Sequence, residues 1–151
     1  YSEHLIEHLS CEQGQHLLRE CRRVLAPDGV LRVATPDLAA LVDSYAGDWR
    51  DQDWVQWPGH EWIDTPARML NQAMRSWGHQ HLYDAEELEH RLRLAGFTDI
   101  RRCDLGRSAH YDLAGLETRA DSKLIFEARN PRQDHPRSRS RAPSCLPCRN
   151  T

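Results

Sequence analysis

The side chains best suited to acid–base chemistry fall in two short histidine-containing segments. The first contains His4, Glu7 and His8, and the second contains His79 and His81. A histidine with a pKa of about 6.5 can take a proton from an attacking hydroxyl group at neutral pH. The second segment falls between two predicted helices, where it is suited to cap a substrate cleft. We therefore predict that His4, Glu7 and His79 are catalytic.

The first segment also fits the pattern His-x-x-Glu-His of the inverted zinc peptidases. Two histidines four residues apart on a helix can share one metal ion while the glutamate acts as a base. This alternative, a metal-dependent hydrolase, needs a third ligand and a longer helix than the stretch before Ser10 allows. We therefore favour a site without a metal, in which His4 and His8 pack against the protein or face a substrate.

Hydrophobic periodicity and capping residues predict the elements that position these segments. The predicted buried side of the second helix consists of Leu38, Leu41, Val42 and Tyr45. Four tryptophans between residues 48 and 64 fall in a polar stretch without periodicity, so we assign residues 48–83 to an insertion or lid. The predicted helices run from Ser10 to Leu25, from Pro36 to Gly47, from Thr65 to Trp77 and from Asp84 to Ala95, and the predicted strands cover residues 30–35, 98–103 and 123–128.

Composition limits the classes of partner. The chain has 151 residues and a formal net charge of −3, and the arginine-rich stretch 129–151 means that the rest is more acidic than the whole. Because nucleic-acid binding needs clustered lysine and arginine, we expect no nucleic-acid partner. No apolar run approaches the ~20 residues of a membrane span, and the start lacks a secretory signal pattern. We therefore expect a cytoplasmic protein that does not bind membranes.

Three phrases, in order and at the right spacing, carry a resemblance to a known family. They are the acidic–histidine pair Glu7-His8, the phrase from Arg23 to Gly29 (RVLAPDG) and the phrase from Leu92 to Phe97 (LRLAGF). Over residues 1–129 the chain resembles the C-terminal half of class I S-adenosylmethionine-dependent methyltransferases of the type 11-like group. The stretch 77–84 is also similar to bacterial methyltransferase-like proteins associated with surface-polysaccharide genes.

This resemblance implies an α/β, Rossmann-like fold, truncated so that Tyr1 follows strand four of the family. The glycine-rich turn and the ribose-binding acid of the family would then precede Tyr1. Strand four would lie beside strand five, and strand seven between strands five and six. The implied cofactor is S-adenosylmethionine, and the implied reaction is methyl transfer to an oxygen or nitrogen of a small molecule or glycan. The implied cofactor-binding residues are Tyr1, Ser2 and Glu3, and the expected substrate-facing residues are Asp37, His81 and Tyr83.

One alternative and two further expectations complete the predictions. The alternative to an enzyme is a non-catalytic remnant that serves as a binding module. Residues 130–151, rich in Arg, Ser and Pro, are expected to form a disordered tail, in which Cys145 and Cys148 form a lone CxxC pair. If the truncation is as the resemblance implies, strand 30–35 loses a neighbour, and the exposed edge favours self-association.

Overall fold

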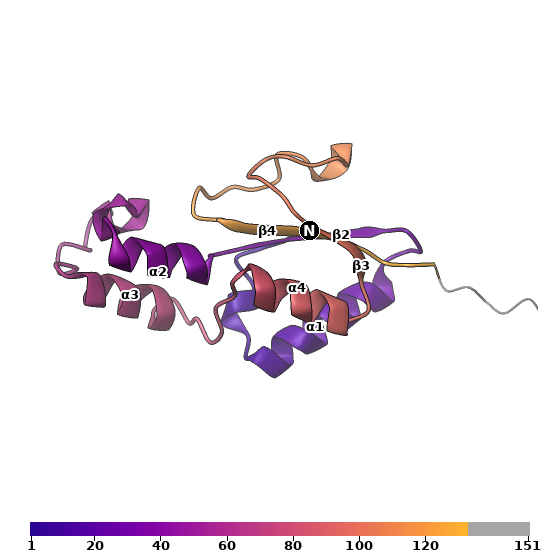
Figure 1. The fold of residues 1–151 in the computed structure, drawn as a ribbon, viewed down its shortest axis with the longest axis horizontal. Coiled ribbons are helices and arrows are strands. Elements are labelled where there is room, and N and C mark those ends of the chain that lie inside the picture. Colours follow the sequence, from indigo (N-terminus) through magenta and orange to yellow (C-terminus); the bar gives the residue numbers. More distant parts are fainter. Residues whose placement is uncertain (133–151) are drawn as a thin grey trace, which may run out of the picture.

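The computed structural model of the protein describes residues 1–132 (Figure 1). Most of the expected disordered tail, residues 133–151 with the CxxC pair, lies outside these residues, whereas Asn130, assigned to that tail, is buried and its side chain donates a 2.8 Å hydrogen bond to the Leu25 carbonyl. Within them the predicted α/β class is confirmed, as an open four-stranded sheet with four α-helices. None of the helices in this part of the chain is both long and apolar enough to cross a membrane. The elements are β1 (Ser2–Glu3), η1 (Ile6–His8), α1 (Cys11–Val24), β2 (Val30–Thr35), α2 (Leu38–Ala46), η2 (Trp49–Asp51), η3 (Asp53–Gln56), α3 (Pro66–Arg75), α4 (Ala85–Leu94), β3 (Thr98–Arg102), η4 (Tyr111–Leu113) and β4 (Leu124–Arg129).

The sheet has the strand order β1-β2-β4-β3. β1 runs parallel to β2, with Ser2 opposite Val33, whereas β4 runs antiparallel to both of its neighbours. β2 therefore lies between β1 and β4, and β4 lies between β2 and β3. This is the neighbour order that the sequence resemblance implied.

The main core lies between the sheet and two helices. α1 and α4 lie on the same face of the sheet (Figure 1). Leu18 of α1 and Leu88 and Leu92 of α4 are fully buried against Leu31 and Val33 of β2. The segment between β3 and β4 covers the other face, where Arg32 is fully buried. Because strand side chains alternate between faces, one strand serves both layers.

A second core is built by α2, α3 and the stretch between them, which lie at one end of the molecule (Figure 1). The predicted buried side of α2 was wrong for Val42 and Tyr45, which are half-exposed, because only Leu41 faces α3 and the tryptophan-rich stretch. The members of this second core are Leu41, Trp49, Trp54, Val55, Ile63, Met69 and Ala73.

Local signals set the helix ends as predicted. Ser10 accepts a hydrogen bond from the backbone N–H of Gln13, whose side chain accepts one from the Ser10 N–H, so the capping box is formed. At the end of α4, Gly96 adopts a φ of 90°. The backbone N–H of Phe97 then donates to the carbonyl of Leu92, which is the Schellman arrangement.

Candidate functional site

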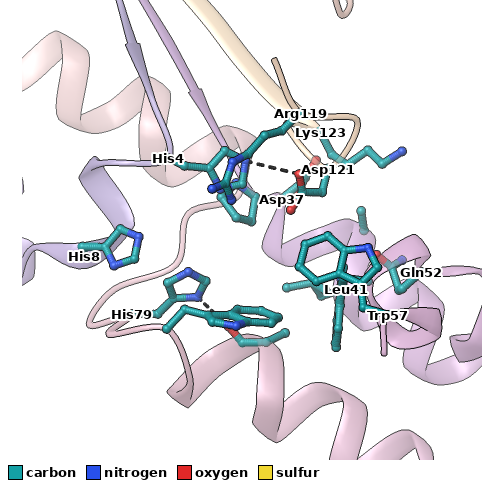
Figure 2. Close-up of a pocket in the computed structure, with 15 residues that line it drawn as sticks. His4, His8, Asp37, Leu41, Gln52, Trp57, His79, Arg119, Asp121 and Lys123 are labelled. Atoms are coloured by element: carbon teal, nitrogen blue, oxygen red, sulfur yellow. Dashed lines mark hydrogen bonds and ion pairs between the residues drawn. The ribbon is translucent and has the colours of Figure 1, made fainter. Parts of the chain in front are cut away.

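A cavity of about 250 Å³ lies where the parallel strands β1 and β2 end. His4 follows β1 directly, and Pro36 and Asp37 follow β2, so each strand delivers side chains into the cavity wall. The second core supplies the opposite wall through α2, α3 and the stretch that joins them. Figure 2 shows how these side chains converge. The lining residues are His4, His8, Pro36, Asp37, Ala40, Leu41, Gln52, Trp54, Trp57, Ala73, Trp77, His79, Arg119, Asp121 and Lys123.

A buried carboxylate lies behind the cavity wall. The Glu7 side chain is fully buried, and its Oε2 accepts a 2.9 Å hydrogen bond from the Thr35 hydroxyl. Nδ1 of His4 lies 3.2 Å from Glu7 Oε1, and Nε2 of His4 lies 3.6 Å from Asp121. Burial raises the pKa of Glu7, but the contacts with His4 and Thr35 outweigh it, so that pKa lies below its ordinary value. Glu7 is therefore an ionised carboxylate that orients His4.

His79 is held in one ring orientation by the end of α3. Its Nδ1 lies 2.7 Å from the carbonyl oxygen of Ala73, which acts only as an acceptor, so Nδ1 carries the proton and Nε2 has a free lone pair. Burial lowers the pKa of His79 more than this hydrogen bond raises it. Its ring meets that of His8 edge-on, with centroids 4.9 Å apart. His79 is therefore a neutral imidazole with one nitrogen available.

The loop before β4 closes the polar side of the cavity and is anchored by Glu3. The Glu3 carboxylate accepts hydrogen bonds from Thr118, Arg119 and Ser122 at 2.7–3.1 Å. Burial raises the pKa of Glu3, but these bonds outweigh it and lower the pKa to about 2. The anchor brings Arg119, Asp121 and Lys123 to the cavity. Sequence reasoning missed these three residues, because no motif or period links Glu3 to a segment more than a hundred residues away.

Aromatic side chains form the third side of the cavity. Trp57 and Trp77 are both about half-exposed, and His60 bridges them, with its ring stacked on Trp57. Trp54 is buried and meets Trp77 edge-on at a centroid distance of 5.3 Å. Indole faces that are open to solvent beside a cavity can stack against a planar ring or the apolar face of a sugar.

The structure brings four of the predicted site residues around one cavity. His4, His79 and Asp37 line it, and Glu7 contacts His4 from behind. Asp37 is itself held by Arg102, whose guanidinium donates a 2.7 Å hydrogen bond to its carboxylate.

The other predicted site residues lie elsewhere. The half-exposed Tyr1 precedes β1, and burial together with nearby Glu3 raises its pKa. Ser2 pairs with β2. His81 lies 3.4 Å from Glu87 on α4. Tyr83 is fully buried in the main core, where burial raises its pKa to about 12. His81 and Tyr83, expected to face a substrate, therefore lie outside the cavity.

The helix required by the peptidase alternative is not formed. Residues 6–8 make a single 3-10 turn, and His4 precedes it with a φ of 47°. The two histidines of the pattern are therefore not on successive turns of one α-helix, which that metal site requires. No protein-family model matches the sequence, and no curated protein matches it either. Function is therefore inferred from the cavity and the fold.

Proposed function

We propose that the protein is an S-adenosylmethionine-dependent methyltransferase and that the cavity binds the methyl acceptor. The observation that carries the proposal is the position of the cavity at the carboxyl ends of the parallel strands β1 and β2. In open α/β sheets, ligands bind in this place, where loops and helix starts converge. His4 and Asp37 reach the cavity because they lie one and two residues, respectively, after the ends of these strands.

The sheet supports a Rossmann-like methyltransferase fold. The resemblance implied that strand four lies beside strand five, with strand seven between strands five and six. The observed order β1-β2-β4-β3, with β4 antiparallel to β2 and β3, is consistent with that arrangement if β1, whose residues Ser2 and Glu3 were expected to follow strand four, is the end of that strand. In this proposal the cofactor-binding half, with its glycine-rich turn, is encoded before Tyr1, and residues 1–132 supply the acceptor side of the cleft.

The lining of the cavity fits a ring-bearing acceptor with hydroxyl or amino groups. Trp57 and Trp77 offer indole faces for stacking, while Asp37, Arg119 and Lys123 offer polar groups that fix orientation. Binding sites of this kind combine an apolar wall with a few directed polar groups. A sugar unit or a small aromatic ring meets both requirements.

Methyl transfer from a sulfonium depends mainly on in-line positioning of the acceptor and the methyl group. S-adenosylmethionine would supply the methyl group as a sulfonium, so that the bond from the acceptor oxygen or nitrogen to the methyl carbon would form as the sulfur–carbon bond breaks, with S-adenosylhomocysteine as the leaving group. The proton of the acceptor would pass to a neighbouring base. His4, oriented by Glu7, and His79, with its free Nε2, are the bases beside the cavity.

A matched pair of tryptophans tests the acceptor site. Trp57 lines the cavity and Trp62 does not, although both are equally exposed. We would assay methyl transfer from labelled S-adenosylmethionine to a panel of sugars and phenols, with the protein that includes the residues encoded before Tyr1. W57A is expected to raise the acceptor KM about tenfold without changing cofactor affinity, whereas W62A leaves both unchanged. Equal effects of the two substitutions, or no transfer to any acceptor, would contradict the proposal.

A further inference from the structure

The cavity wall holds a group of metal-binding side chains that methyl transfer does not require. Ligand atoms of Glu7, His8 and His79 all lie within 4.8 Å of one another. These residues come from the turn after β1 and from the segment after α3, so the fold brings together groups about seventy positions apart. His8 and His79 face the same end of the cavity (Figure 2).

The carboxylate of this group has an oxygen without a hydrogen bond. Glu7 Oε2 is held by Thr35, whereas Oε1 is fully buried and accepts no hydrogen bond from residues 1–132. Nδ1 of His4 lies 3.2 Å from Oε1 as an ion-pair contact, without the geometry of a hydrogen bond. A buried carboxylate oxygen without a hydrogen-bond donor is costly. A cation beside it would remove that cost.

Both imidazoles are prepared to supply nitrogen ligands. The proton on Nδ1 of His79 is fixed by the Ala73 carbonyl, the arrangement by which proteins commonly orient a metal-binding histidine. Nε2 of His8 already lies 3.8 Å from Glu7 Oε1. His8 is about one-third exposed, so its ring has room to adjust toward an ion that its nitrogen would bind at about 2.0–2.1 Å.

In a second group of metal-binding side chains, the carboxylate already has a hydrogen-bond donor. Cys11, His81 and Glu87 also lie close together, but Glu87 already accepts a 2.7 Å hydrogen bond from Arg91. The arginine neutralises the carboxylate, so the group offers a cation less negative charge. It provides a matched comparison for the group in the cavity.

We propose that Glu7, His8 and His79 bind a divalent transition-metal ion of the zinc class, with its remaining coordination positions open to the cavity. Two imidazoles and one carboxylate favour zinc over magnesium or calcium, which prefer oxygen ligands. Three protein ligands leave room for a water molecule or an acceptor oxygen. The site goes beyond the proposed methyl transfer and does not depend on it. If His79 binds the ion, His4 is the base that remains.

Zinc titration of the whole chain by calorimetry tests the site, with variants that preserve local structure. E7Q keeps an oxygen for the Thr35 hydroxyl, and H79N keeps a donor for the Ala73 carbonyl, while each removes one metal ligand. We expect one equivalent of zinc to bind to the wild type and to H81N, and the affinity of E7Q and H79N to fall more than about 100-fold. Zinc should raise the melting temperature of the first two proteins only.

Cobalt(II) in place of zinc distinguishes this site from the cysteines. Nitrogen and oxygen ligation gives no thiolate charge-transfer band, and the spectrum should be unchanged in a variant with serine in place of both Cys145 and Cys148. The proposal would be overturned by any of three results. These are the absence of stoichiometric zinc in the wild type, undiminished binding by E7Q and H79N, and a thiolate band that disappears with the two cysteines.

Discussion

At the scale of single residues, Glu3 holds the loop before β4 in place. Its carboxylate accepts every hydrogen bond that fixes Thr118, Arg119 and Ser122 to β1. Asp121, which belongs to the same loop, lies 3.6 Å from Nε2 of His4. The shape of the polar side of the cavity therefore depends on one acidic residue outside it.

E3Q is expected to lower the free energy of unfolding at pH 7 by about 2 kcal/mol, because hydrogen bonds to a charged acceptor are lost. The folded-state pKa of Glu3, about 2, lies below the unfolded value, so its stabilisation is complete above the unfolded pKa and is lost as pH falls toward 2. Urea unfolding of wild type and E3Q at pH 7 and pH 3 measures the difference between their free energies of unfolding. If this difference is as large at pH 3 as at pH 7, the charge of Glu3 is not its cause.

Which site residues a sequence can reveal depends on how local their positioning is. His4 and Asp37 follow strands, and His79 follows a helix, so patterns near each residue place it at an element end. Arg119 and Lys123 reach the cavity on the loop that Glu3 anchors, through a contact between distant segments that no local pattern encodes.

At the scale of elements, α1 and Tyr83 approach each other through a glycine. A Cβ atom added at Gly14 would lie 2.5 Å from the Tyr83 hydroxyl oxygen, so only glycine fits while that hydroxyl is present. The same hydroxyl is buried and has no hydrogen-bond partner within residues 1–132. It therefore costs stability while it limits how α1 can be built.

Y83F should raise the free energy of unfolding by about 1 kcal/mol, because it removes a buried polar atom that has no partner. G14A alone should destabilise the protein through the clash, although alanine favours helices over glycine. In the double variant the clash is gone, so G14A should cost far less than in the wild type. Chemical denaturation of the four proteins gives this coupling. Additive effects would contradict the packing described here.

Helix and strand boundaries followed from local sequence signals, but the ionic network on the covered face of β2 did not. Arg32 is the one charged residue in β2, whose other residues are apolar apart from Thr35. The structure shows it fully buried, with Glu117 at 2.5 Å and Glu127 at 2.7 Å. Glu117 lies in the loop between β3 and β4, so periodicity within β2 does not reveal this partner.

R32M is expected to destabilise the fold by about 3–5 kcal/mol, because two buried carboxylates lose their cation. R93M, which removes an exposed arginine paired with Glu89 on α4, should change the unfolding free energy by less than about 1 kcal/mol. Replacing Arg32, Glu117 and Glu127 together by apolar residues should restore most of the loss. Denaturant unfolding checks all three, and an R32M effect as small as that of R93M would rule out the buried network.

At the scale of the whole molecule, the cavity lies between two cores. The sheet with α1 and α4 carries His4 and Asp37, while α2 and α3 carry the aromatic wall. One edge of β2 pairs with β4 along its whole length. On the other edge, β1 pairs only with Val33 and Ala34, and no described strand pairs with residues 30–32. Self-association through this edge stays a prediction.

Cofactor titration tests the methyltransferase proposal most directly. The proposal places the glycine-rich turn and the ribose-binding acid before Tyr1, and the acceptor side of the cleft in residues 1–132. Calorimetry should therefore show micromolar S-adenosylmethionine binding by the protein that includes the residues encoded before Tyr1, and weak or no binding by residues 1–151 alone. Absence of binding by the longer protein would contradict the proposed function, and micromolar binding by residues 1–151 alone would contradict the proposed division of the site.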